Sequence, residues 1–261
     1  MSDVLAPGLA ELVVVFSHPD DEILFFFQAI RWLRPRRLRL LCATGDFGAM
    51  TAVRRRELAA SARSLEGELT NLELTDRKGK GLDAGELASA LAHVDKAGGV
   101  PVLTHGPLGE YGHRHHVDVF HSVHRRYGED VWCLSGPLPP HLSFDAAPAA
   151  LQEQEHCLRS IYSSQRDVLS WICPRLELTH LARMVDRDLL QAGDPLGAAP
   201  AVPRERIDAL LDPWESSCRD LAAMPAVTRV IARAWDRYRV CRDLEQRCKE
   251  WRQTLTGDLP C

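Results

Sequence analysis

A histidine, a proline and three consecutive acids follow a run of apolar residues near the N-terminus. The stretch VVVFSHPDDE, residues 13–22, places Asp20, Asp21 and Glu22 side by side just after a buried-looking segment. Adjacent carboxylates repel one another, and each is costly to remove from water. A bound divalent cation would cancel much of this repulsion, and zinc accepts both imidazole nitrogen and carboxylate oxygen. The stretch therefore predicts a metal site to which His18 and Asp21 contribute.

A second cluster of histidines could complete such a site. A catalytic zinc ion takes three protein ligands and keeps one open position, so at least one more ligand is needed. Five of the chain's 11 histidines fall within twelve residues; they are His113, His115, His116, His121 and His124. The cluster follows a predicted strand and His18 ends another, so we expect both at one edge of a sheet. His121 and His124 lie on the predicted following helix, where we expect them to face solvent or to be structural.

Together the two clusters resemble the PIG-L/LmbE-like family of zinc-dependent N-deacetylases. The matching segments are HPDDE at 18–22, TGDFG at 44–48, RRRELAASARSLEG at 54–67 and EYGHRHH at 110–116, with a weaker match in YSSQ at 162–165. The family includes deacetylases of N-acetylglucosaminyl-phosphatidylinositol, of mycothiol and bacillithiol precursors, and of amino-sugar antibiotic intermediates. The resemblance covers about residues 12–125.

The resemblance implies the metal ligands. It makes His18, Asp21 and His116 the ligand set, with Zn²⁺ as the expected cofactor, although Fe²⁺ or Co²⁺ would accept the same donors. A shared cation requires the imidazoles of His18 and His116 to lie within about 5 Å of each other.

The resemblance also implies which residues act on the substrate. Asp20 becomes the general base, because one of two adjacent aspartates can bind the metal while the other faces water. His113 becomes the residue that stabilises the oxyanion and can donate a proton. Arg54 matches an arginine that helps to hold the substrate, and Tyr111 matches a position whose hydroxyl reaches the reacting carbonyl in some relatives.

One position departs from the family pattern. The family usually reads His-Pro-Asp-His where this chain reads His113, Arg114, His115 and His116. The usual aspartate would orient the nearby histidine or couple to its charge, and His115 removes that negative charge. The protonation state of His113, and the pH optimum with it, is therefore left open. A non-catalytic ligand-binding relative with a degenerate site is one alternative.

Predicted strands and helices alternate through the first 145 residues. The strands are expected at 11–18, 37–48, 69–76, 100–106, 131–136 and 141–144, and the helices at 22–33, 51–67 and 83–99. Such alternation predicts an α/β fold, with a Rossmann-like, mostly parallel sheet and helices on both faces. Ligands of these sheets bind beyond the carboxyl ends of the strands, where the polar clusters of this chain fall.

The chain is expected to have two parts. We predict a PIG-L/LmbE-like deacetylase domain over residues 1–193, with helical segments at 147–173 and 174–193. A linker at 194–203 would lead to a helical C-terminal extension, residues 203–261, packed on the core. A lid or an oligomer contact is the alternative role of this extension, so a homo-oligomer is left open.

Composition excludes some classes of partner. The net charge is −4 and the pI is about 6.3, so no overall basic field favours nucleic acid or an anionic membrane. No apolar run approaches the roughly 20 residues that span a bilayer. The N-terminus lacks a positive region before its apolar run, and the eight cysteines form no CxxC pair. We expect a reduced, cytoplasmic protein.

These observations predict a zinc-dependent hydrolase that removes an N-acetyl or other N-acyl group from an amino sugar or amino-sugar conjugate. Its partner would be this small molecule, in natural-product or thiol-cofactor biosynthesis. An amidase of a larger thiol or peptide-like conjugate is the closest alternative.

Overall fold

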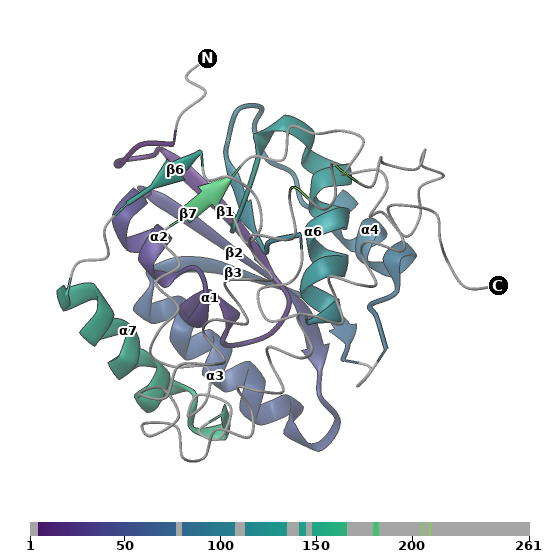
Figure 1. Cartoon of the computed structure of the whole chain (residues 1–261). Helices are drawn as coiled ribbons and strands as arrows, with labels where there is room; N and C mark the ends of the chain where they lie inside the picture. The colour runs from purple at the N-terminus through teal and green to yellow at the C-terminus, as the bar shows by residue number, and fades with distance from the viewer. Residues whose placement is uncertain are drawn as a thin grey trace.

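A seven-stranded sheet, in the order β3-β2-β1-β4-β5-β7-β6, forms the centre of the molecule (Figure 1). The computed structural model describes residues 5–76, 80–107, 113–134, 141–144, 148–165 and 180–182, with the single positions 205 and 209. The strands from β3 to β5 are parallel, and β7 runs antiparallel to both β5 and β6. The predicted α/β fold with a mostly parallel sheet is confirmed.

Strands and helices alternate along most of the described chain. The strands are β1 (Glu11–Phe16), β2 (Arg37–Asp46), β3 (Gly67–Thr75), β4 (Val102–Thr104), β5 (Val131–Leu134), β6 (Leu142–Ser143) and β7 (His180–Ala182). The α-helices are α1 (Asp21–Leu24), α2 (Phe27–Leu33), α3 (Thr51–Ser64), α4 (Ala84–Ala92), α6 (Arg114–Tyr127) and α7 (Pro148–Ile161). Short 3₁₀ segments are η1 (Gly48–Met50), η2 (Gly128–Asp130) and η3 (Ser163–Gln165).

Helices cover both faces of the sheet. Helices α1, α2, α3 and α7 pack on one face, and α4 and α6 pack on the other (Figure 1). Side chains of a strand point alternately to opposite faces, and β1 shows what this requires. Its Val14 and Phe16 pack in the apolar core beneath α1, α2, α3 and α7, while Val13 and Val15 pack in the core beneath α4 and α6. All four are fully buried. A strand covered on both faces must be apolar throughout, as the sequence predicted.

The single long helix predicted at 22–33 is wrong, because α1 and α2 are separated at Phe25 and Phe26. Successive residues of an α-helix point about 100° apart, so a continuous helix would direct these two rings to different places. The break instead brings both rings against His105, with centroids 6.1 and 5.3 Å away. Gln154 of α7 donates to the carbonyls of Ile23 and Leu24, at 2.7 and 3.2 Å, and so satisfies the interrupted end of α1.

A strand replaces part of the helix predicted at 174–193. Residues 180–182 form β7, which pairs with β5 through Cys133 and Ala182. An unpaired edge of β5 would leave a row of N–H and C=O groups without partners, and this long-range pairing outweighs the local helical pattern. The predicted extension at 203–261 lies outside the described residues apart from positions 205 and 209, so the division into two parts stays a prediction.

In the part of the chain that the structure describes, no helix is long and apolar enough to cross a bilayer. Three cysteines fall within the same part, and Cys42, Cys133 and Cys157 are all buried thiols. This burial agrees with the expected behaviour of cysteine as a small apolar residue.

Helix α6 buries two histidines that were candidates for a solvent-facing position. His121 is 3% exposed and His124 is 7% exposed, so of the two predicted alternatives the solvent-facing one is wrong. The ring of Phe120 lies 4.5 Å from that of His124. Burial, with the charge of His121 as a smaller cause, lowers the pKa of His124 to about 3. The folded protein therefore holds His124 neutral.

This burial predicts a loss of stability in mild acid. Because the unfolded chain protonates His124 below about pH 6.5 and the folded chain does not, folding becomes less favourable as the pH falls from there towards 3. His124 should contribute a slope of about 1.4 kcal/mol per pH unit in that window. Urea unfolding between pH 7 and pH 5 should give a shallower slope for His124→Leu than for wild type. His156→Leu, at an exposed position of α7, should keep the wild-type slope, and equal slopes for all three proteins would contradict the prediction.

Candidate metal centre

The sheet order brings the two predicted clusters to one place. Strand β1 pairs with β2 on one side and with β4 on the other, so the order of strands reverses between β1 and β4. In open α/β sheets, ligands bind at such a switch point, beyond the carboxyl ends of the strands. The segment from Ser17 to Asp21 leaves β1 at this end, and His105 directly follows β4. His113 is the N-cap of α6, which packs on β1 and β4.

His18, Asp21 and His116 form a compact donor set. One possible ligand atom from each lies within 4.8 Å of the others. Asp21 Oδ2 is 3.4 Å from both His18 Nδ1 and His116 Nε2, and it accepts a hydrogen bond of 2.7 Å from the backbone N–H of His18. The centroids of the two imidazoles are 5.4 Å apart, but their donor nitrogens lie closer, and those are the atoms that a cation binds. Two imidazoles and a carboxylate, all buried, are a donor set that suits a divalent metal.

Asp21 is held as a carboxylate by its neighbours. Burial by itself raises the pKa of Asp21, but His116 first, with His105 and His18, outweighs burial and lowers the pKa well below its usual range. A deprotonated carboxylate is the form that binds metal.

The pKa of Asp20 is shifted in the opposite direction to that of Asp21. It is 5% exposed, and burial raises its pKa well above the usual range, although the charge of Arg54 opposes this shift. Arg54 Nη1 lies 3.4 Å from Asp20 Oδ2. Two adjacent carboxyl groups with pKa values pushed apart are a pattern of acid–base sites.

The backbone of Asp20 is strained. Its φ of 111° and ψ of −28° are in the left-handed region, which a non-glycine residue enters at a cost on the order of 1–3 kcal/mol. This turn separates Asp20 from the first helical residue, Asp21, so the two carboxyl groups can have different partners.

Glu22, the third acid, is satisfied inside the protein. Its carboxylate accepts hydrogen bonds from Ser61 Oγ, from Tyr162 Oη and, at 3.1 Å, from the backbone N–H of Asp20. Burial raises the pKa of Glu22 to about 7, while the Ser61 and Tyr162 contacts oppose the rise. The three consecutive acids therefore avoid mutual repulsion by having three separate sets of partners.

The segment YSSQ at 162–165, a weak match in the sequence, joins this network. Tyr162 contacts Glu22, as described above, and Ser164 donates through its backbone N–H to Glu57 Oε1 at 2.8 Å. Ser163 Oγ donates to the same oxygen at 3.2 Å. These bonds fasten η3 to α3 behind the acidic turn, which gives this segment a structural role.

The guanidinium of Arg54, a predicted substrate-binding group, makes contacts within the protein. Its guanidinium donates from Nη2 to the carbonyl of Pro19 and contacts Asp20, and its Cζ lies 5.3 Å from the centre of the Phe47 ring. It is 5% exposed. The structure thus places Arg54 beside Asp20, while Tyr111, the other predicted substrate-binding residue, lies outside the described residues.

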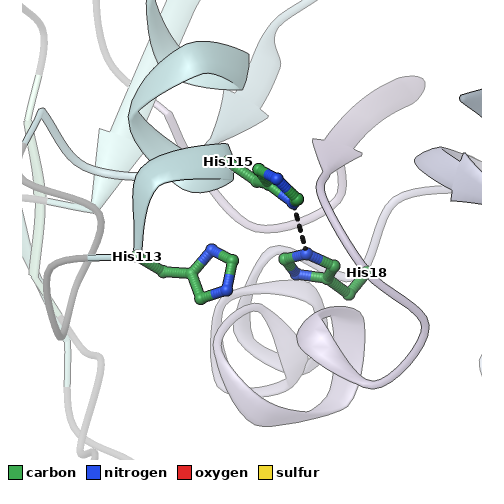
Figure 2. Close-up of side chains that lie close together, drawn as sticks. All are labelled: His18, His113 and His115. Atoms are coloured by element: carbon green, nitrogen blue, oxygen red, sulfur yellow. Dashed lines mark hydrogen bonds between the residues drawn. The ribbon is translucent and has the colours of Figure 1, made fainter. Parts of the chain in front are cut away.

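His113 lies against the donor set without being one of the three predicted ligands. Its ring centroid is 4.6 Å from that of His18 and 4.8 Å from that of His116. Burial is the main cause that lowers the pKa of His113, and His116, His18 and His115 lower it further. A neutral imidazole at this position can donate one N–H. Figure 2 shows the rings of His113 and His115 close to that of His18, with His115 and His18 joined by a dashed line.

Two residues at the site received no role from the sequence. His105 Nε2 accepts a hydrogen bond of 3.0 Å from the backbone N–H of Ser17, and its ring stacks on His116 with centroids 3.8 Å apart. Its position near the carboxyl end of the strand predicted at 100–106 was the available signal. His115, noted only as a departure from a pattern, has its Nδ1 2.9 Å from His18 Nε2 (Figure 2).

Comparison with known proteins finds a family model that matches the region of this site. Residues 13–127 match the family model PIG-L, described as GlcNAc-PI de-N-acetylase. Residues 13–127 form a PIG-L domain. The predicted family resemblance is thereby confirmed, and the PIG-L domain runs from β1 through α6. It contains the whole donor set, together with Asp20, Arg54 and the histidines around His18.

A curated relative and a solved structure are also similar. A probable N-acetylglucosaminyl-phosphatidylinositol de-N-acetylase of Schizosaccharomyces pombe is 27% identical over 127 residues, which cover 44% of this chain and 51% of the relative. The chain therefore matches about half the length of that protein. The crystal structure of GalB, the 4-carboxy-2-hydroxymuconate hydratase of Pseudomonas putida KT2440, aligns with a TM-score of 0.42 and 18% identity over 66% of this chain and 94% of GalB.

Proposed function

We propose that this chain is a metal-dependent amide hydrolase that removes the N-acetyl group from an N-acetylglucosamine-type substrate, with Zn²⁺ as the metal. The observation that carries the proposal is the pairing of the donor set His18, Asp21 and His116 with Asp20, a second carboxyl group of opposite pKa shift. The PIG-L domain and the name of the yeast relative support the choice of an acetylated amino sugar.

His18, Asp21 and His116 would hold the cation. Two imidazole nitrogens and one carboxylate oxygen suit Zn²⁺ and leave a coordination position for substrate or water, and Fe²⁺ or Co²⁺ would accept the same donors. When bound, such a cation polarises the amide carbonyl and makes water a better nucleophile near neutral pH.

Asp20 would act as the general base. A raised pKa makes its carboxylate a stronger base than an ordinary aspartate, and proton transfer of this kind typically contributes about 10²–10⁴-fold to the rate. Arg54, which contacts Asp20 Oδ2, would keep the carboxyl group oriented. Asp20 takes a proton from the attacking water as the oxygen of that water bonds to the amide carbon.

His113 would stabilise the charge that develops on the carbonyl oxygen. As a neutral imidazole it donates its N–H to that oxygen, and loss of one such donor typically costs about 2.7–4 kcal/mol of barrier. The C–N bond then breaks and the nitrogen receives the proton that Asp20 had taken, which gives acetic acid and a free amine. The acetic acid loses its remaining proton to the amine or to solvent and leaves as acetate. A fully protonated His113 is not required for this step.

A product assay tests the proposal. Zinc-loaded protein would be incubated with N-acetylglucosamine, N-acetylglucosaminyl-inositol and an N-acylated thiol or peptide-like conjugate, and mass spectrometry would follow acetate and free amine. We expect acetate and amine in equal amounts from a glucosamine conjugate, and none after chelation of the metal. Preference for the thiol or peptide-like conjugate would favour the larger-substrate amidase. One zinc per chain with no hydrolysis of any compound would favour a non-catalytic binding protein.

The pathway and the compartment belong to the same proposal. A role in natural-product or thiol-cofactor biosynthesis, and a cytoplasmic location, rest on the sequence expectations alone. Identification of the amine that accumulates or disappears when the gene is deleted would test the pathway.

A further inference from the structure

His115 is held at both of its ring nitrogens. Its Nε2 lies 2.7 Å from the backbone carbonyl oxygen of Lys80, and its Nδ1 lies 2.9 Å from His18 Nε2. The side chain is buried, at 2% exposure, and its ring lies beside that of His18 (Figure 2). Both contacts have hydrogen-bond length, so the ring has little freedom to rotate.

The carbonyl of Lys80 determines where the protons lie. A carbonyl oxygen can only accept, so His115 Nε2 carries the proton of that bond. In a neutral imidazole the other nitrogen is then an acceptor, which makes His115 Nδ1 the acceptor and His18 Nε2 the donor of the second bond. His18 Nδ1 is left with a lone pair, and this is the atom that faces Asp21 Oδ2 at 3.4 Å.

The Lys80 carbonyl is itself held in place by α6. The backbone N–H of Leu82 donates to Asp118 Oδ2 at 2.8 Å. A Cβ added at Gly81 would lie 2.8 Å from Asp118 Oδ2 and 3.2 Å from Arg114 Nε, so the chain approaches the helix this closely only because residue 81 is glycine. The acceptor for His115 thus belongs to a segment docked on the helix that carries His115.

We propose that His115 is a positioning residue of the metal centre, which accepts the Nε2 proton of His18 and thereby presents His18 Nδ1 to the cation. The inference rests on the proposed function, since it takes His18 as a metal ligand. Metal-binding histidines commonly give their other N–H to a carboxylate or a carbonyl. In this chain an imidazole takes that place, and the Lys80 carbonyl fixes its tautomer. The departure from the family's His-Pro-Asp-His pattern therefore keeps an acceptor at the site while removing a charge.

Direct metal binding by His115 is the alternative to its positioning role, and the two must be distinguished by experiment. His18, His113 and His115 also have potential ligand atoms within 4.8 Å of one another. If a cation bound this group through the two nitrogens that face each other, His18 Nε2 and His115 Nδ1, no hydrogen bond could join them. A doubly protonated His115 would be a second contradiction, because it would donate to His18 Nε2 and leave the proton of His18 on Nδ1.

The tautomers can be observed directly in the wild-type protein. Long-range ¹H–¹⁵N correlation spectra of ¹⁵N-labelled, zinc-loaded protein distinguish protonated, bare and metal-bound ring nitrogens. We expect His18 to be protonated at Nε2 and metal-bound at Nδ1, and His115 to be protonated at Nε2 and bare at Nδ1. Metal on His18 Nε2 or His115 Nδ1, a second bound zinc ion, or a proton on His18 Nδ1 would each overturn the proposal.

Metal affinity of two variants provides an independent measurement. His115→Ala removes the acceptor and should weaken zinc binding by about 10- to 100-fold in a competition titration with a chelator. His115→Asn keeps an acceptor oxygen close to the position of Nδ1 and should stay within about threefold of wild type. His93→Ala, at an exposed position of α4's C-cap, is the matched control and should bind as wild type does. Equal affinity of His115→Ala and wild type would refute the positioning role, whereas a wild type that binds no zinc would refute the metal centre itself.

Discussion

Replacement of Asp20 by asparagine is expected to lower kcat by about 10²–10⁴-fold, because the proposed general base is lost. Asparagine has the same shape and tolerates left-handed backbone conformations as well as aspartate does, so the strained turn at φ 111° should persist. Its side-chain oxygen can still accept from Arg54. Steady-state acetate release and zinc content by mass spectrometry would measure the two effects, and zinc content should stay at one ion per chain.

The contrast between activity and metal content is what makes this variant informative. A wild-type rate in Asp20→Asn would remove Asp20 from the proposed mechanism. Loss of both zinc and activity would instead make Asp20 part of the ligand set. Ser64→Ala, on the same helix as Arg54, removes a hydroxyl that donates to the carbonyl of Ser61 and provides a control for unspecific effects of mutation.

Removal of His116 should have the second large effect. His116 is fully buried, and its Nε2 lies 3.4 Å from Asp21 Oδ2, within the donor set. His116→Ala should weaken zinc binding by more than the roughly 10- to 100-fold that loss of an outer partner causes, and hydrolysis should fall to background. Added zinc or cobalt at high concentration should restore part of the activity if only affinity is lost.

Two measurements separate a ligand from a residue that merely supports the fold. Isothermal titration of metal-free protein should detect the loss of affinity, while circular dichroism of the metal-free variant should match that of metal-free wild type. His93→Ala should change neither. If His116→Ala retained tight zinc binding, the assignment of the donor set would be wrong, and the neighbouring group of His18, His113 and His115 would be the next candidate.

Local patterns in the sequence predicted the elements around the site well. The apolar run of β1 could be read as a strand because a strand covered on both faces has no polar positions, and Val13 to Phe16 are fully buried. The prediction failed where a distant contact competed with the local pattern. Residues 180–182 became a strand because β5 and β6 needed a partner, and the helix at 22–33 broke where Phe25 and Phe26 turn towards His105.

The sequence alone determined which residue types meet at the switch point of the sheet, because polar residues that directly follow parallel strands must gather at one edge. It therefore predicted that His18 and Asp21 meet the histidine cluster there. The family resemblance implied His116 as the third ligand and marked His115 as a departure from the family pattern. Only the tertiary structure decided what each group does there, since partners such as Lys80, Ser61 and Tyr162 come from distant parts of the chain. The pKa values of Asp20 and Asp21 diverge for the same reason: burial and neighbouring charges, and not adjacency in sequence, determine which carboxyl group keeps its proton.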